Sequence, residues 1–193
     1  MQQENKTKIL IFGIIVVIIG IMVGVIPIFL QNDKRITENK KVDDYIKETS
    51  IDNTQGESEY LLVLEIPKVN LKRGVYPIDS SENTIEKNVQ IMREGTLPDE
   101  DNGNLVLAAH NGTAAISYFN QLHRLGVNDQ AYIYYQGTKY TYIVDKIYDV
   151  SKDGDVEVYR DLDKNTLTLI TCKKDTDDRQ LVIILYLSEK ENY

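Results

Sequence analysis

The sequence predicts a mostly-β protein, a closed barrel of eight short strands with short helices, preceded by an N-terminal transmembrane helix. Three observations support this fold class. Ile9 to Leu30 contains no charged or polar residue. The remainder alternates short runs rich in Val, Ile, Leu and Tyr with turn residues. No strand–helix–strand rhythm is visible, and closing a sheet into a barrel removes its unpaired edges.

The N-terminal apolar run is long enough to cross a bilayer. As a helix it would extend about 33 Å, against a hydrocarbon core of about 30 Å. A cleavable signal peptide is the alternative, because Lys6 and Lys8 precede the run. The apolar part of a signal peptide spans only about 7–15 residues. We therefore expect a cytoplasmic tail over residues 1–8 and an uncleaved anchor over residues 9–30.

The segment after the anchor, residues 31–58, is polar and charged and is predicted to be a linker or stalk. Thr37–Lys47 could form a short helix within it, and Ser50–Ser58 has the composition of a loop. Whether this segment is a passive stalk or folds over an active site is left open. The globular domain is expected over residues 59–193.

Eight runs in this domain are typical of strands, and two are typical of short helices. Helical spacing favours Ser81–Met92 and Ile116–Leu125. Gln136–Thr138 is typical of a hairpin turn between two strands. The predicted strands are Tyr60–Ile66, Val69–Tyr76, Asn104–Ala109, Ala131–Tyr135, Lys139–Val150, Val156–Arg160, Thr166–Cys172 and Gln180–Leu187.

Charge and cysteine content narrow the function classes. The formal net charge is −8, and such a surface repels nucleic acid, which argues against a DNA or RNA partner. The chain has 1 cysteine, so no intramolecular disulfide can form. A lone thiol in an exported domain is either a small buried hydrophobe or a reactive group.

Cys172, His110 and Arg179 form the candidate catalytic set. Cys172 and His110 each end an apolar strand and precede a polar segment, so two strand ends at one rim would bring imidazole and thiol together. Arg179 opens the following strand, and its permanent charge could stabilise the thiolate and a developing oxyanion.

The same residues could instead have purely structural roles. A cysteine at a strand end can be inert packing, and Arg179 could pair with Asp177 or Asp178. His123 is the rival histidine, although its place in a helical pattern is more typical of a surface residue.

Four segments resemble the sortases, the transpeptidases of Gram-positive cell surfaces. Thr168–Cys172 is similar to the TLxTC motif of that family. The others resemble its arginine strand, its histidine segment and its first barrel strand, and they are Arg179–Ile183, Leu107–Gly112 and Leu64–Leu71. Ala109 replaces the Gly often found before the histidine. The resemblance covers about residues 60–187.

The resemblance implies a sortase-type barrel outside the cell, anchored with the N-terminus inside and the C-terminus outside. It implies that Cys172 attacks the Thr carbonyl of an LPxTG-like sorting signal, that His110 is the general acid/base, and that Arg179 positions the substrate and stabilises the oxyanion. The partners would be secreted proteins carrying the signal and an amine acceptor, such as a peptidoglycan cross-bridge. Thr171, Ala109 and Asn111, beside the nucleophile and the histidine, would contact the substrate.

Class A or class D is expected within the family. Val150–Thr168 is too short for the extra helix of class B. The aspartate–aromatic lid motif and the hydrophobic segment after Leu187 that are typical of class C are missing from the sequence.

No cofactor is expected, although some relatives bind calcium. Asp99–Asp101, Asp149, Asp153, Asp155 and Glu157 could supply oxygen ligands, but acidic loops are more often only solvated. Zinc is disfavoured in a chain with 1 Cys and 2 His.

Two other functions remain open. An L,D-transpeptidase would carry His and Cys in one short segment, whereas His110 and Cys172 are far apart in sequence. A tethered β-domain that binds a surface partner, with an inert buried thiol, is the second.

Overall fold

The computed structural model describes the backbone of residues 2–52 and 58–193, and the side chains of 13–24, 26, 37–50 and 58–193. The helix α1 covers Gln2–Asp52. The chain divides into two compact units, Met1–Lys40 and Lys41–Tyr193. We describe each unit by itself.

The first unit consists of the N-terminal part of α1. Its described side chains from Ile14 to Val23 include large apolar groups that are 46–68% exposed. Within the described residues, no helix contains an apolar stretch that meets the length needed to cross a membrane. Of the predicted span 9–30, the side chains of residues 9–12, 25 and 27–30 lie outside the described part.

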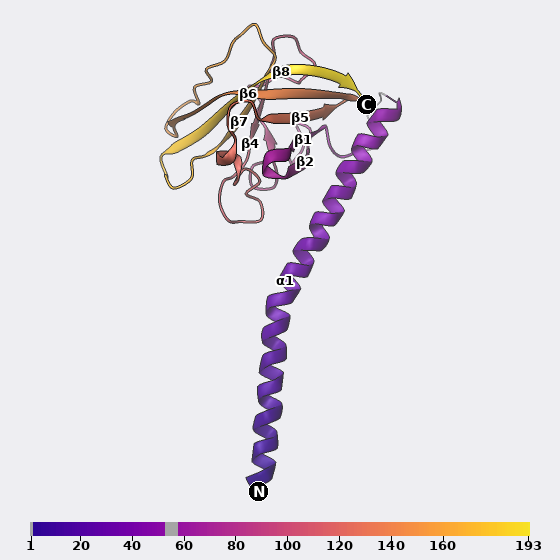
Figure 1. Ribbon diagram of the computed structural model, residues 1–193, viewed down its shortest axis with the longest axis vertical. Helices are drawn as coiled ribbons and strands as arrows, with labels where there is room; N and C mark the ends of the chain where they lie inside the picture. Colours follow the sequence, from indigo (N-terminus) through magenta and orange to yellow (C-terminus); the bar gives the residue numbers. More distant parts are fainter. Residues whose placement is uncertain (1, 53–57) are drawn as a thin grey trace. The chain divides into compact units, whose positions relative to one another are not determined.

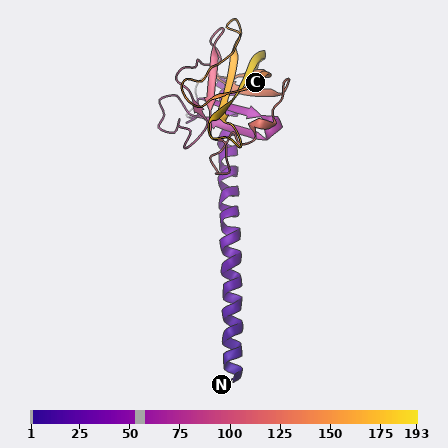
Figure 2. The same ribbon diagram turned by 90° about the vertical axis from the view of Figure 1, so that its left-hand side faces the viewer.

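The second unit is a nearly closed β-barrel (Figures 1 and 2). In the described residues eight strands form one sheet, in the order β2-β1-β5-β6-β8-β7-β4-β3. Neighbouring strands are antiparallel except for β4 and β7, which are parallel. The strands are β1 (Leu62–Ile66), β2 (Leu71–Val75), β3 (Gln90–Ile91), β4 (Asn104–Ala108), β5 (Gln130–Tyr135), β6 (Thr138–Ser151), β7 (Thr166–Cys172) and β8 (Arg179–Asn192).

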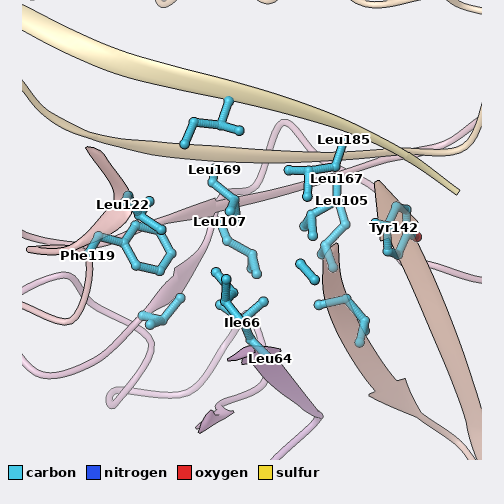
Figure 3. Close-up of a cluster of buried hydrophobic side chains, with 14 of the residues drawn as sticks. Leu64, Ile66, Leu105, Leu107, Phe119, Leu122, Tyr142, Leu167, Leu169 and Leu185 are labelled. Carbon is cyan, nitrogen blue, oxygen red and sulfur yellow. The ribbon is translucent and has the colours of Figure 1, made fainter. Parts of the chain in front are cut away.

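The barrel interior is filled by alternate residues of the strands, because successive side chains of a strand point to opposite faces. Leu64 and Ile66 of β1 meet residues of β4, β7 and β8 there (Figure 3). The facing residues are Leu105, Leu107, Leu167, Leu169, Leu181, Ile183 and Leu185. Val182 and Ile184 of β8 are also fully buried, so this strand is covered on both faces and has the continuous apolar sequence expected of such a strand.

Asparagine side chains connect the two edge strands of the sheet, β2 and β3. Asn88 is fully buried just before β3. It accepts a 2.7 Å hydrogen bond from Arg73 Nε and donates a 2.9 Å bond to the Gly74 carbonyl, both on β2. Side-chain bonds thus join the barrel where strand pairing stops.

The strand predictions were largely confirmed, including the turn between β5 and β6. Gln136 and Gly137 occupy this two-residue turn with φ of 47° and 72°, which is the left-handed geometry of a tight hairpin. The predicted strand Val156–Arg160 was wrong. There the backbone bonds to a side chain instead of to a neighbouring strand. The Tyr148 hydroxyl donates a 3.0 Å hydrogen bond to the Glu157 carbonyl and accepts a 2.8 Å bond from the Tyr159 N–H.

Both predicted helices in the barrel domain were wrong in form. Ser81–Met92 is a series of turns that ends in β3, because Asn83 binds the backbone of Ile78 and Ile91 and so competes with helical bonding. Within Ile116–Leu125 only the 3₁₀ helix η2 (Leu122–Arg124) forms. A second 3₁₀ turn, η1 (Pro67–Val69), follows β1.

The C-terminal turns of α1 belong to the barrel unit. Val42, Tyr45 and Thr49, spaced along one helical face, are 1–3% exposed. The Tyr45 hydroxyl donates to the Leu61 carbonyl at 2.6 Å, and the Thr49 and Tyr193 hydroxyls lie 2.8 Å apart. In the region predicted to be a polar stalk, this part of the chain is therefore helical and packed beside β1.

Candidate active site

The ends of β4 and β7 lie level because the two strands are parallel neighbours in register. Ala108 pairs with Ile170, and one residue further the Ala109 N–H donates to the Ile170 carbonyl at 3.3 Å. The Thr171 hydroxyl then donates to the Ala109 carbonyl at 2.8 Å. His110 and Cys172, the next residues of the two strands, therefore reach the same rim of the barrel.

A side chain after His110 connects the two strand ends directly. Asn111 Nδ2 donates a 2.9 Å hydrogen bond to the Cys172 carbonyl, and the His110 carbonyl accepts a 3.1 Å bond from the Phe119 N–H. The backbone on both sides of the imidazole is thus fixed. In the described structure the two strand ends are joined by this network and not by a hydrogen bond between the His110 and Cys172 side chains.

The thiol lies on the outer face of the barrel. Leu167 and Leu169 of β7 point into the core, so strand alternation turns Ile170 and Cys172 outward. Cys172 is a free, partly exposed cysteine. Thr168 and Ile170 on the same face are 0% and 8% exposed, so the sulfur is accessible only at the strand end.

Arg179 begins β8, close to Cys172 in the ladder. Cys172 pairs with Gln180, and the Lys173 N–H donates to the Arg179 carbonyl at 2.9 Å. The guanidinium lies against β6, where Nη2 donates to the Asp149 carbonyl at 3.0 Å and Nε is 3.9 Å from Asp149 Oδ2. Its partner in this structure is thus Asp149, rather than Asp177, Asp178 or the thiol.

Asp149 also binds the residue that follows Cys172. The Lys173 ammonium donates to Asp149 Oδ2 in a short contact. One carboxylate therefore binds both Lys173 and Arg179, which face each other one step beyond the Cys172–Gln180 pair of the β7–β8 ladder. Sequence reasoning considered Asp149 only as a calcium ligand, because nothing in a linear sequence indicates pairing between β6 and the segment after β7.

A pocket of about 310 Å³ opens beside Arg179, between the end of β6 and the loop that follows it. Tyr148 organises this loop through its two hydroxyl bonds, and burial, followed by the charge of Glu157, raises the pKa of Tyr148 to about 12. The lining residues are Asp149, Val150, Ser151, Asp153, Asp155, Glu157, Tyr159 and Arg179.

Four of the acidic residues considered for calcium, Asp149, Asp153, Asp155 and Glu157, line this pocket. Among the described residues, no group of three or more His, Cys, Asp or Glu side chains is close enough to hold a metal ion. His123, the rival histidine, is exposed on η2 beside the buried Leu122.

The residues predicted to contact substrate occupy two kinds of position. Thr171 and Ala109 are 3% and 5% exposed and bond to each other across the strand ends. Asn111 is partly exposed and bonds to the Cys172 carbonyl. The observed contacts of all three hold the rim together, and substrate contact stays a prediction.

Comparison with known proteins identifies the family. The family model described as Sortase domain matches residues 64–187, which is more than half of the chain. The chain belongs to the sortase family. Sortases are cysteine transpeptidases that sort proteins to the cell wall, and the chain's single cysteine is consistent with this chemistry. No curated protein matches the chain in sequence.

Solved sortase structures share the fold. Sortase A of Listeria monocytogenes is 20% identical with a TM-score of 0.59, covering 70% of this chain and 91% of its own. A Clostridium perfringens sortase D5 transpeptidase is 21% identical with a TM-score of 0.61, covering 79% and 98%. Sortase C-1 of Actinomyces oris is 21% identical with a TM-score of 0.61, covering 77% and 79%. Because three classes match equally well, assignment to class A or class D stays a prediction.

Proposed function

We propose that this sortase cleaves an LPxTG-like sorting signal at the Thr–Gly bond and transfers the acyl product to an amine, such as a peptidoglycan cross-bridge. The observation that carries the proposal is the register of β4 and β7. It brings His110 and Cys172 to one rim, where the thiol is partly exposed. A thiol nucleophile and an acid/base on neighbouring strand ends are the parts that acyl transfer requires.

The reaction would run in two balanced steps. The Cys172 thiolate attacks the Thr carbonyl carbon, an S–C bond forms, and the C–N bond to Gly breaks while His110 donates a proton to the leaving amine. The acceptor amine then attacks the thioester carbon, His110 takes its proton, and the thiolate leaves. The same histidine thus serves first as acid and then as base.

Arg179 would stabilise the oxyanion of both tetrahedral intermediates. A charged donor is most effective where negative charge develops. In the present structure its guanidinium is bound to Asp149. Gln180, and not Arg179, pairs with Cys172, so strand alternation starts the Arg179 side chain on the opposite face of the sheet from the thiol. The proposal therefore requires this side chain to turn around the end of β8 toward the thiol when substrate binds. The contacts to be replaced are one partly buried hydrogen bond to the Asp149 carbonyl and one partly exposed 3.9 Å ion pair, each of which contributes on the order of 1 kcal/mol.

We also propose that residues 9–30 anchor the enzyme in the cell membrane, with residues 1–8 inside and the barrel outside. The apolar sequence, its helical backbone and the exposure of Ile14 to Val23 support this. A cysteine-free full chain carrying one introduced cysteine at residue 3 or residue 190 tests it in intact cells. Labelling at residue 190 alone by an impermeant maleimide is expected, and labelling at residue 3 alone would reverse the orientation.

The enzymatic proposal is tested with the full chain in detergent and a quenched LPxTG peptide, with and without a glycine amine. Wild type should release the fluorescent product and join the acyl fragment to the amine, while Cys172→Ala should do neither. Cleavage by Cys172→Ala would refute the nucleophile. A folded wild-type enzyme that leaves every LPxTG-type peptide intact would refute the substrate class.

A further inference from the structure

Gln180 lies directly across the β7–β8 ladder from Cys172. The neighbouring pair is hydrogen-bonded, because the Lys173 N–H donates to the Arg179 carbonyl at 2.9 Å. Hydrogen-bonded and non-hydrogen-bonded pairs alternate in an antiparallel ladder, so Cys172 and Gln180 form a non-hydrogen-bonded pair, the type with the closest side chains. Both side chains lie on the same face of the sheet, and this is the outer face.

The side-chain amide oxygen of Gln180 is buried and has no hydrogen-bond partner among the described residues. Within the described residues, Oε1 is shielded from solvent and has no hydrogen-bond partner, and the same holds for Thr176 Oγ1 in the β7–β8 connection. Other buried amides of the barrel, those of Asn83 and Asn88, are paired. Buried acceptors in folded proteins are nearly always satisfied. An acceptor without a protein partner beside Cys172 is available to a donor that arrives with the substrate.

The strand order indicates which part of the substrate supplies this partner. In the order β8-β7-β4, Gln180 and His110 stand on opposite sides of Cys172. If His110 protonates the leaving amine, the leaving segment lies toward β4. The acyl segment, bonded to the same carbonyl carbon, then lies toward β8, and the nearest donor in it is the backbone N–H of the residue under attack.

We propose that Gln180 is a substrate-binding residue whose Oε1 accepts the backbone N–H of the residue whose carbonyl Cys172 attacks. The inference rests on the proposed function, since it places the acyl segment by the role of His110. Accepting this bond would orient the reacting carbonyl before attack and keep the acyl fragment aligned in the thioester while the amine arrives. It involves no reactant beyond those of the proposed reaction.

The test compares two peptides and three variants of the full chain in detergent. One peptide is the LPxTG amide, and the other replaces the N–H of its Thr by an ester oxygen. Gln180→Met removes the acceptor at similar size, and Gln180→Glu keeps an acceptor. Gln130→Met is the matched control, because Gln130 is an exposed glutamine on β5.

Gln180→Met should lower kcat/KM for the amide peptide about tenfold, mainly through KM. Wild type should show the same tenfold decrease in kcat/KM when the ester peptide replaces the amide peptide. Gln180→Met should then cleave the ester peptide with the same kcat/KM as wild type does. Gln180→Glu should recover part of the amide KM, and Gln130→Met should match wild type. Equal losses on both peptides, or a change confined to the KM of the amine acceptor, would overturn the inference.

Two further outcomes are separable. Should Gln180→Met fail to fold, wild type alone decides, since equal kcat/KM on the amide and ester peptides overturns the inference. Failure of wild type to cleave the amide peptide would refute the proposed function, and this inference with it.

Discussion

The two sides of the Cys172 rim are held in different ways. On the β4 side, neutral hydrogen bonds, buried at Thr171 and partly buried at Asn111, fix the backbone at His110 and Cys172. On the β8 side, Arg179 is held by one hydrogen bond to the Asp149 carbonyl and by a partly exposed 3.9 Å ion pair with the Asp149 carboxylate. Buried bonds are costly to break, whereas exposed ion pairs are weak and screened by salt. The proposed nucleophile and acid/base are therefore built into the sheet, while the proposed exchange of partners by Arg179 breaks only weak contacts.

The largest effect should come from removing the acid/base. We expect His110→Gln to lower kcat/KM for the LPxTG peptide by about 10²–10⁴, because proton transfer to the leaving amine is lost. His123→Gln is the matched control, since this exposed histidine on η2 should leave kcat/KM unchanged. Equal effects of the two substitutions, measured by peptide cleavage, would remove the reason for pairing His110 with Cys172.

The second effect concerns the arginine. Arg179→Gln should lower kcat by about 10²–10³, through loss of the charged oxyanion donor. Asp149→Asn should keep the carbonyl that accepts the Arg179 bond but weaken both ion pairs, and we expect less than a tenfold change in kcat with a reduced dependence on salt. If Asp149→Asn lowered kcat as much as Arg179→Gln, the pair would act as one rigid unit and the proposed exchange of partners would be wrong.

The third prediction compares two buried threonines of β7. Thr171→Val should lose the bond to the Ala109 carbonyl and destabilise the fold by about 1–3 kcal/mol. Thr168→Val loses a 2.8 Å hydrogen bond to the side chain of Asn104, the first residue of β4, and should reduce the free energy of unfolding by a similar amount. Only Thr171→Val should also lower kcat. Urea denaturation and peptide cleavage measure the two effects, and equal kcat for both variants would show that rim geometry does not depend on Thr171.

The smallest expected effect measures how much a partly exposed ion pair contributes to the free energy of unfolding. A 2.7 Å contact with Lys68 holds the pKa of Asp129 below its usual value. A carboxylate with a lowered folded-state pKa adds stability that is present above its unfolded pKa and is lost as pH falls through the folded value. Asp129→Asn should therefore destabilise the fold by less than about 1 kcal/mol at pH 7 and by less still in acid. Urea denaturation at several pH values measures the loss of unfolding free energy caused by Asp129→Asn. If that loss stayed constant or grew at low pH, the charge of Asp129 would not be the source of its contribution.

Much of the barrel could be predicted from local pattern. The structure of strands such as Thr166–Cys172 and of the Gln136–Gly137 turn is determined by a few adjacent residues. The strand ends at Cys172 and His110 also indicated that these two residues lie at one rim. What failed depends on distant partners. Gln90–Ile91 is a strand only because β4 pairs with it, and Val156–Arg160 is not a strand because Tyr148 binds its backbone.

The same limit applied to the site. The attachment of Arg179 to Asp149 joins β8 to β6, and a linear sequence holds no signal for that contact. The unsatisfied oxygen of Gln180 is likewise visible only once β7 and β8 are paired. Sequence identifies residues whose type determines chemistry, whereas the partners of those residues require the fold.

The most direct test of the central claim is the mass of the acyl-enzyme. The full chain in detergent is mixed with LPxTG peptide without an amine, quenched in acid and measured intact and after digestion. The account predicts an added mass equal to the acyl fragment, located on Cys172, discharged by a glycine amine and missing in Cys172→Ala. Peptide cleavage by wild type without this adduct, or an adduct on another residue, would contradict it.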